Sequence, residues 1–383
     1  MSEISELLAE MVHIPSVNPG GKAPQSDIEG EARMTRFVRE YLEARGVQCA
    51  LQEVSPGREN VIGVVRGEGN GTLVMETHMD TVSVAEMTIE PFDPAVGDGL
   101  VHGRGSCDAK ASLAAMMTAL VRIAADGPPP QDCVLAAVVD EEFGYTGVKR
   151  LLQDCGEVAG AVIGEPTMLE VVIAHKGAVR WRVTTRGVSA HSSDPGQGVN
   201  AIYQMARVVT ALEAYAEQVA SGEGHPLVGA PTLSVGTIRG GTAVNIVPES
   251  CEALVDRRLI PGERIPDVEA GLLEFLRAEL GDEVDFEVGG LLQDPPLETP
   301  PDADVVQRLK ASAEAVLGEA KLTGAAYGTD ASKFSDAGIP AVVCGPGDIA
   351  QAHTADEWVA IQQVERAADL YEAFLRGEAG NGE

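Results

Sequence analysis

The sequence predicts an α/β fold, in which a larger domain with a mostly parallel sheet is interrupted by an inserted α+β domain. Three observations support this prediction. Short apolar runs alternate with helical patterns up to about residue 175, the pattern changes near Lys176, and the alternation resumes after the proline-rich segment 294–304. A chain of 383 residues is also longer than one hydrophobic core accommodates comfortably.

The larger domain begins with helical periodicity and continues with short strands. We expect helices at 7–12, 32–44 and 109–125, and strands at 60–65, 72–76, 134–139 and 160–164. The strands are short apolar runs, as in a parallel sheet that is covered on both faces. The chain ends in an amphipathic helix at 360–376.

The middle of the chain has the pattern of an antiparallel sheet with helices. Residues 178–185 alternate between apolar and polar, as in a strand with one solvated face. We expect a helix at 200–220, strands at 232–238 and 250–259, a helix at 266–280 and a strand at 284–288. This β-α-β-β-α-β order is typical of a ferredoxin-like domain. The sequence therefore predicts domains at 1–176 with 291–383, and at 177–290.

Composition limits the partners and the compartment. The net charge of −31 disfavours nucleic acid and anionic membranes, and no segment approaches the roughly 20 apolar residues that span a bilayer. The N-terminus begins as an acidic amphipathic helix without the basic region of a signal peptide. Six cysteines without a CxxC pair fit reduced thiols. We therefore expect a cytoplasmic protein that binds neither nucleic acid nor membrane.

Five residues of metal-ligand type each follow a short apolar run: His78, Asp108, Glu142, Glu165 and His353. In an open α/β sheet, the ligand crevice lies outside the carboxyl ends of the strands, so these side chains are expected to converge. Two imidazoles and three carboxylates suit a pair of zinc-like ions that share one carboxylate. The pattern indicates a metal-dependent hydrolase.

Each of these signals has an alternative explanation. His78 and Asp80 are two residues apart and share one side of an extended segment, so the carboxylate can orient the imidazole, or the two can form a simple surface pair. Asp108 can also cap the following helix. In the DEE segment, Glu142 can bind metal while Glu141 acts as general base, or both can belong to a solvated loop. The shared position at strand ends favours the metal site.

Several short sequence motifs, which occur in the same order along the chain, resemble those of the dinuclear-zinc deacylase and exopeptidase family. They are THMDTV, GRGSCDAK, DEEFG, GEPT, AHKGAVR, AHSS, GVNAI, NIVPE, GTDASKF and AGIPAVVCGPG followed by AHT. The resemblance extends over nearly the whole chain and is closest to acetylornithine deacetylase-like members. It departs from the family at Thr77, Ser83 and Ala111, none of which is a ligand or the base.

The resemblance implies a zinc-exopeptidase-like catalytic domain, an inserted dimerisation or lid domain, and a role for each site residue. One metal is expected to bind His78, Asp108 and Glu165, and the other metal is expected to bind Asp108, Glu142 and His353. Asp80 is expected to support His78, and Glu141 is expected to be the general base. His191 is expected to serve the oxyanion site of a partner subunit, and Asn245 and Arg258 are expected to contact substrate. Arg258 can alternatively pair with an acid of its own domain. The resemblance also implies a cis peptide between Asp108 and Ala109.

The expected activity is hydrolysis of the amide bond of an N-acyl amino acid by a homodimer with two divalent ions, zinc before cobalt or manganese. N-acetylornithine, and with it arginine biosynthesis, is the first expectation. Succinyl-diaminopimelate desuccinylase, a broad aminoacylase and a dipeptidase or carboxypeptidase remain alternatives. A metal-binding scaffold without catalysis is disfavoured by Glu141, since a scaffold needs ligands but no base.

Overall fold

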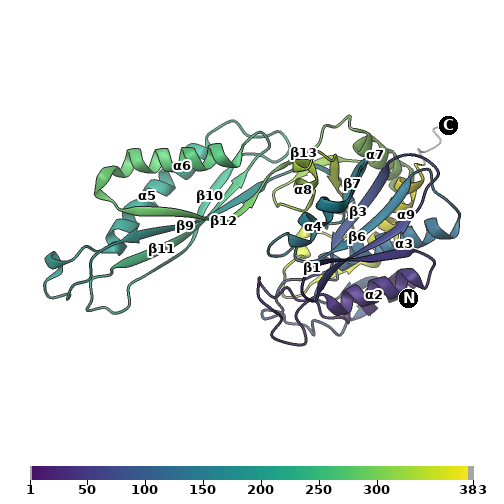
Figure 1. Cartoon of the computed structure of the whole chain (residues 1–383), viewed down its shortest axis with the longest axis horizontal. Helices are drawn as coiled ribbons and strands as arrows, with labels where there is room; N and C mark the ends of the chain where they lie inside the picture. The colour runs from purple at the N-terminus through teal and green to yellow at the C-terminus, as the bar shows by residue number, and fades with distance from the viewer. Residues whose placement is uncertain (1, 378–383) are drawn as a thin grey trace. The chain divides into compact units, whose positions relative to one another are not determined.

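The computed structural model describes residues 2–377, which divide into two compact units (Figure 1). Residues up to Ile173, Thr299–Thr323 and the residues from Thr329 onward form the first unit. Ala174–Glu298 and Gly324–Gly328 form the second. The sequence placed the transitions at 176/177 and 290/291, whereas the chain passes between the units at 173/174 and 298/299 and returns to the second unit over 324–328. None of the helices in residues 2–377 is long and apolar enough to cross a membrane.

The first unit is built on a nine-stranded sheet of order β1-β2-β6-β3-β7-β15-β8-β13, with β14 paired to β8. The strands of this sheet are β1 Gln48–Ser55, β2 Arg58–Val65, β3 Thr72–His78, β6 Asp132–Val138, β7 Gly160–Ile163, β8 Val171–His175, β13 Leu297–Glu298, β14 Leu322–Ala325 and β15 Ala341–Val343. Of these, β13 and the last two residues of β8 and of β14 belong to the second unit. The central strands β6, β3, β7 and β15 are parallel, which confirms the predicted mostly parallel sheet. Antiparallel pairs flank them on both sides.

The helices of the first unit enclose this sheet. They are α1 Glu3–Val12, α2 Ala32–Glu43, α3 Lys110–Ala125, α4 Thr146–Asp154, α7 Asp304–Leu317, α8 Ala331–Asp336 and α9 Ile361–Arg376. A small second sheet joins β16 (Trp358–Ala360), β5 (Leu100–His102) and β4 (Val96–Gly97) in that order. The predicted helices at 7–12, 32–44, 109–125 and 360–376 are thus confirmed to within a few residues.

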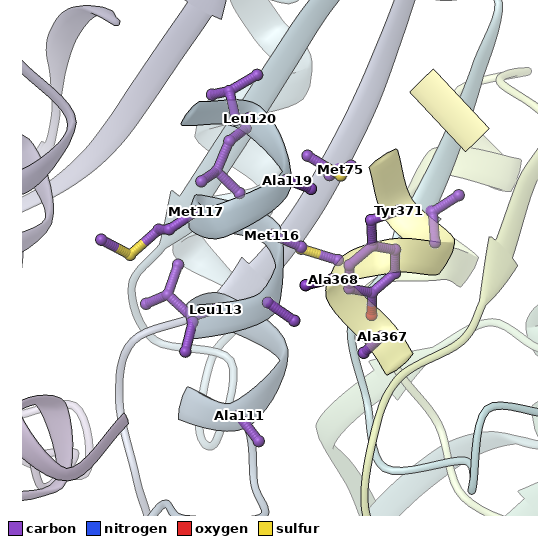
Figure 2. Packing of buried hydrophobic residues seen from close by; sticks show 14 of the residues in the cluster. Met75, Ala111, Leu113, Met116, Met117, Ala119, Leu120, Ala367, Ala368 and Tyr371 are labelled. Carbon is purple, nitrogen blue, oxygen red and sulfur yellow. The ribbon is translucent and has the colours of Figure 1, made fainter. Parts of the chain in front are cut away.

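Helix α3 is the central helix of the core. It consists mainly of alanine, leucine and methionine, which have high helix propensity, and it is buried over most of its length. Figure 2 shows Met116 of α3 directed toward Tyr371 of α9, where Ala367 and Ala368 leave room for it. Because α3 begins two residues after Asp108, this packing also determines where Asp108 lies.

The second unit has an antiparallel sheet of order β10-β11-β9-β12 with two helices. Its elements are β9 Gly177–Arg186, α5 Ala201–Ala220, β10 Thr232–Gly240, β11 Ser250–Leu259, α6 Ile265–Leu280 and β12 Phe286–Asp294. This is the predicted β-α-β-β-α-β order. The core gathers Trp181, Leu212 and Leu272, among others. The last strand continues past the predicted end at 288 through two glycines, because a register shift between Gly290 and Leu292 keeps it paired with β9.

Candidate metal centre

The first unit brings all five ligand-type residues to one end of its sheet. His78 is the last residue of β3, and Glu142 and Glu165 follow β6 and β7 by a few residues. Asp108 precedes α3, and His353 lies in the loop before β16. The five residues therefore lie at or next to the carboxyl ends of the parallel strands, as expected for the ligand site of an open α/β sheet.

Asp108 lies at the centre of this group, between the two imidazoles. Its Oδ1 lies 3.1 Å from Nε2 of His78, and its Oδ2 lies 3.1 Å from Nε2 of His353. Each imidazole has one further carboxylate beside it: Glu165 Oε1 is 3.7 Å from the His78 nitrogen, and Glu142 Oε1 is 3.3 Å from the His353 nitrogen. Candidate ligand atoms of His78, Asp108 and Glu142 all lie within 4.8 Å of one another.

The electrostatics of the group fit cations. Burial raises the pKa of Glu142, and it raises the pKa of Glu165 well above the ordinary carboxyl value. Burial opposes the charge of Asp108 too, but hydrogen bonds from His353 and His78 hold its pKa below the usual range. The hydrogen bonds to Asp108 and Glu142 in turn raise the pKa of His353 to about 10. Several buried carboxylates around two nitrogen donors form a set that divalent ions of the zinc type fit.

Asp80 lies beside the ring of His78 with both its main-chain carbonyl and its carboxylate. The Nδ1 of His78 lies 2.9 Å from the carbonyl oxygen of Asp80 and 3.7 Å from its carboxylate. This contact leaves Nε2 of His78 available as a ligand atom. The carboxylate also accepts the backbone N–H groups of Glu141 and Glu142, at 3.2 and 3.1 Å. The support of His78 by the carboxylate of Asp80 stays a prediction.

The segment Asp140–Glu142 is held by a buried polar network that the sequence did not reveal. The amide of Asn18 donates to Asp80 at 2.8 Å and to Asp140 at 3.0 Å. Arg58 also donates to Asp140, at 3.0 Å. Asp140 adopts a positive φ of 68°, which is uncommon outside glycine, and these contacts hold it there. No local sequence signal links Asn18, Arg58 and Asp140, which are far apart along the chain.

Glu141 directly precedes the candidate ligand Glu142 and interacts electrostatically with His78 and Glu165. Its pKa is raised well above the ordinary value, mainly by burial and further by the neighbouring carboxylates of Glu165 and Asp330. A raised pKa favours a carboxyl group that both takes up and releases a proton, as a general base and acid must. The cis peptide expected between Asp108 and Ala109 is confirmed.

The remaining predicted residues lie in the second unit, near opposite ends of β11. The ring of exposed His191 is 2.8 Å from the Ser193 hydroxyl, and the backbone N–H of Ser192 donates to the carbonyl of Asn245, so His191 and Asn245 are neighbours. Arg258, in contrast, pairs with Ala178 at the other end of the strand. Its guanidinium lies 2.7 Å from Asp256, so the alternative of an internal acid partner is realised.

Comparison with known proteins gives consistent results. Residues 74–377 match Peptidase family M20/M25/M40. An acetylornithine deacetylase of Myxococcus xanthus is 35% identical over 345 residues, which cover 86% of this chain and 88% of that protein. The M20 family metallo-carboxypeptidase Sso-CP2 of Sulfolobus solfataricus has a TM-score of 0.80 at 20% identity, with 98% and 99% of the two chains covered. A dinuclear metal-binding M20 peptidase of Bacillus subtilis has a TM-score of 0.74 at 14% identity, with 98% and 96% covered.

Proposed function

The chain belongs to peptidase family M20/M25/M40 and is a metal-dependent amidohydrolase, and we propose that it hydrolyses the amide bond of N-acyl amino acids, with N-acetylornithine as its first substrate. The observation that carries the proposal is the position of Asp108, whose two oxygens face two imidazoles, each with a further carboxylate beside it. The choice of substrate is supported by the similarity to the Myxococcus xanthus deacetylase.

Two divalent ions, with zinc as the first choice over cobalt and manganese, would be held by the five residues. His78, Asp108 and Glu165 would bind one ion, Asp108, Glu142 and His353 would bind the other, and Asp108 would be shared. This division follows the distances between the side chains, since each imidazole lies next to Asp108 and one other carboxylate. When bound, such ions polarise a carbonyl and make water more acidic.

Glu141 would move the protons of the reaction. It takes a proton from the attacking water and delivers it to the departing amine nitrogen, and its raised pKa suits both steps. Asp80 would support His78, and it also holds the backbone of Glu141 and Glu142.

The second unit would complete the site in a homodimer. His191 and Asn245 lie near one end of β11 and Arg258 near the other. Arg258, after release from Asp256, would bind the substrate carboxylate, and Asn245 would bind the substrate amide. His191 would serve the oxyanion site of the partner subunit.

Self-association through the second unit is supported by its surface. Strand β10 is an edge of its sheet, and edges pair readily with a second chain. Large apolar side chains are exposed around it and the start of α5: Val188, Val199, Ile202, Tyr203, Ile238, Val244 and Ile246. Clustered exposed apolar residues mark interaction surfaces.

We place the protein in the cytoplasm, in keeping with its six free cysteines.

A substrate panel tests the proposed function. Metal-free protein is reconstituted with zinc, cobalt or manganese and assayed with N-acetylornithine, succinyl-diaminopimelate, N-acetyl derivatives of neutral amino acids, and dipeptides. We expect the highest kcat/KM for N-acetylornithine, and none without metal. A preference for dipeptides would replace the deacetylase assignment by a peptidase, and absence of hydrolysis across the panel would contradict the proposal.

A further inference from the structure

Glu357 is a completely buried carboxylate whose hydrogen-bond donors all come from one loop. Its Oε1 accepts the backbone N–H groups of Cys107 and Asp108, at 2.9 and 3.0 Å. Its Oε2 accepts the backbone N–H of Gly105 at 3.0 Å and the guanidinium of Arg104 at 2.7 Å. The side chain is 0% exposed. These four donors belong to the segment that ends in Asp108, the central residue of the candidate metal centre.

Arg104 connects the same carboxylate to two other ligand-bearing segments. Its second terminal nitrogen donates to the carbonyl oxygen of Ser83, at 3.1 Å, and to that of Thr354, at 3.3 Å. Ser83 follows shortly after His78 and Asp80, and Thr354 follows His353 directly. The pair formed by Arg104 and Glu357 therefore contacts the segments that carry His78, Asp108 and His353.

The small sheet fixes this pair in register. Trp358 of β16 pairs with His102 of β5, and the backbone N–H of Gly103 donates to the carbonyl of Glu357 at 3.0 Å. The loop between them is tight: Gly105 has a φ of +82°, and a Cβ there would lie 2.8 Å from Thr81. The Glu357 side chain thus reaches the backbone of residues 105–108 from an anchored position.

We propose that Glu357, together with Arg104, is a positioning residue for the candidate metal centre, which fixes the direction of both Asp108 oxygens. A buried carboxylate is costly unless donors compensate it, and here all its side-chain donors come from the segment that presents Asp108. Because Asp108 faces both imidazoles, displacement of its loop alters both metal positions together. The inference rests on the proposed function only in that it assumes two metal ions at this centre.

The test is the metal affinity of Glu357→Gln. The carboxamide keeps the size of the side chain but offers one acceptor oxygen instead of two. Its NH₂ group would face N–H donors, so the two hydrogen bonds that one of the carboxylate oxygens accepts are lost. Loss of groups that orient ligands weakens metal binding by about 10–100-fold. We expect a loss of this size at both sites, measured by zinc titration against a chelator, with stoichiometry from atomic spectroscopy and a changed visible spectrum of the cobalt form.

Asp132→Asn is a matched control. Asp132 also accepts hydrogen bonds from an arginine, Arg66, and from a backbone N–H, that of Gly67, and it lies at the start of β6, away from the carboxyl ends. We expect it to bind both metals normally. Arg104→Lys keeps the charge but loses the forked contacts, so it is expected to weaken both sites less than Glu357→Gln does.

Two results would overturn the inference. One is a folded Glu357→Gln protein, with circular dichroism as in the unsubstituted chain, that binds two metals with unchanged affinity. The other is a loss confined to one of the two sites. If Glu357→Gln does not fold, the same comparison is made with Arg104→Lys. Failure of the unsubstituted chain to bind two metals would instead contradict the proposed function, so the two failures are distinguishable.

Discussion

Asp108 illustrates how one sequence position supports two different interpretations. A carboxylate just before a helix is a common N-cap, and that alternative fits the sequence. In the structure the N-cap position of α3 is Ala109, without a capping side-chain hydrogen bond, and both Asp108 oxygens face imidazoles instead. The capping alternative is therefore wrong, and the central position of Asp108 leads to a test by substitution.

Asp108→Ala is expected to weaken both metal sites, whereas Glu165→Ala and His353→Ala weaken mainly one each. The reason is that Asp108 lies next to both imidazoles, while Glu165 lies beside His78 alone and His353 beside Glu142. Metal content after dialysis, measured by atomic spectroscopy, checks this asymmetry. Equal losses in the three variants would argue against a shared carboxylate.

Glu141→Gln is expected to abolish turnover while both metals remain bound. The amide keeps the shape of the side chain but cannot transfer a proton, and loss of a positioned acid or base lowers kcat by about 10²–10⁴-fold or more. Steady-state rates and metal analysis of the same preparation check the result. A near-normal rate, or the absence of one metal, would exclude Glu141 as the general base.

The sequence identified the residues that converge, but not those that hold them in place. His78, Asp108 and the DEE segment could be predicted because each follows an apolar run and belongs to a sequence motif of a known family. The buried partners Asn18, Arg58 and Glu357 act through hydrogen bonds to residues that are far away in sequence. Such pairing depends on the tertiary fold, and a single sequence contains no local pattern for it.

At the level of elements, strands that form apolar runs or alternate regularly between apolar and polar residues were predicted, whereas strands without such a pattern or without a clear boundary were not. The apolar runs of β3, β6 and β7 identified these strands from sequence. The edge strand β1 was missed, because in Gln48–Ser55 no residue is fully buried and the composition is mixed. The short strand β8 is buried, but Lys176 alone separates it from β9, so no turn residue between the two marks it as a separate strand.

Gly164→Ala tests whether the packing of α3 on a strand end maintains the metal centre. A Cβ at Gly164 would lie 2.7 Å from both Met116 and Ser112 of α3. Overpacking of this kind costs about 1–3 kcal/mol, and it would displace α3 relative to neighbouring Glu165. We expect a lower midpoint of urea unfolding and weaker metal binding. Gly289→Ala, where nothing lies within 4 Å, is the control and should change neither.

The whole molecule carries a large excess of negative charge. With 59 acidic and 28 basic residues, the net charge of −31 makes the folded chain repel itself. The screening length falls from about 30 Å at 0.01 M salt to about 8 Å at 0.15 M. We therefore expect Tm to rise with sodium or potassium chloride, with most of the increase below roughly 0.3 M. A Tm independent of salt, or one that rises equally in neutral sucrose, would contradict this explanation.

The assembly of the molecule decides whether the catalytic residues come from one chain or two. His191 is exposed, and its ring contacts Ser193. It lies in the second unit, whereas Glu141 and the candidate ligands lie in the first. In a two-fold dimer, each subunit can lend the same residue to the site of the other. Two variants that are inactive for different reasons can then regain activity when they form a mixed dimer.

Mixing Glu141→Gln protein with His191→Ala protein tests this directly. If His191 acts on the partner's site, one site of a mixed dimer combines an intact Glu141 with an intact His191 from the other chain. The other site of that dimer lacks both, so up to half of the activity per mixed dimer should return. The control mixes each variant with itself under the same exchange conditions, and subunit exchange is followed with two fluorescent labels. If the labels exchange and no activity appears, His191 acts within its own chain or has no role in the reaction.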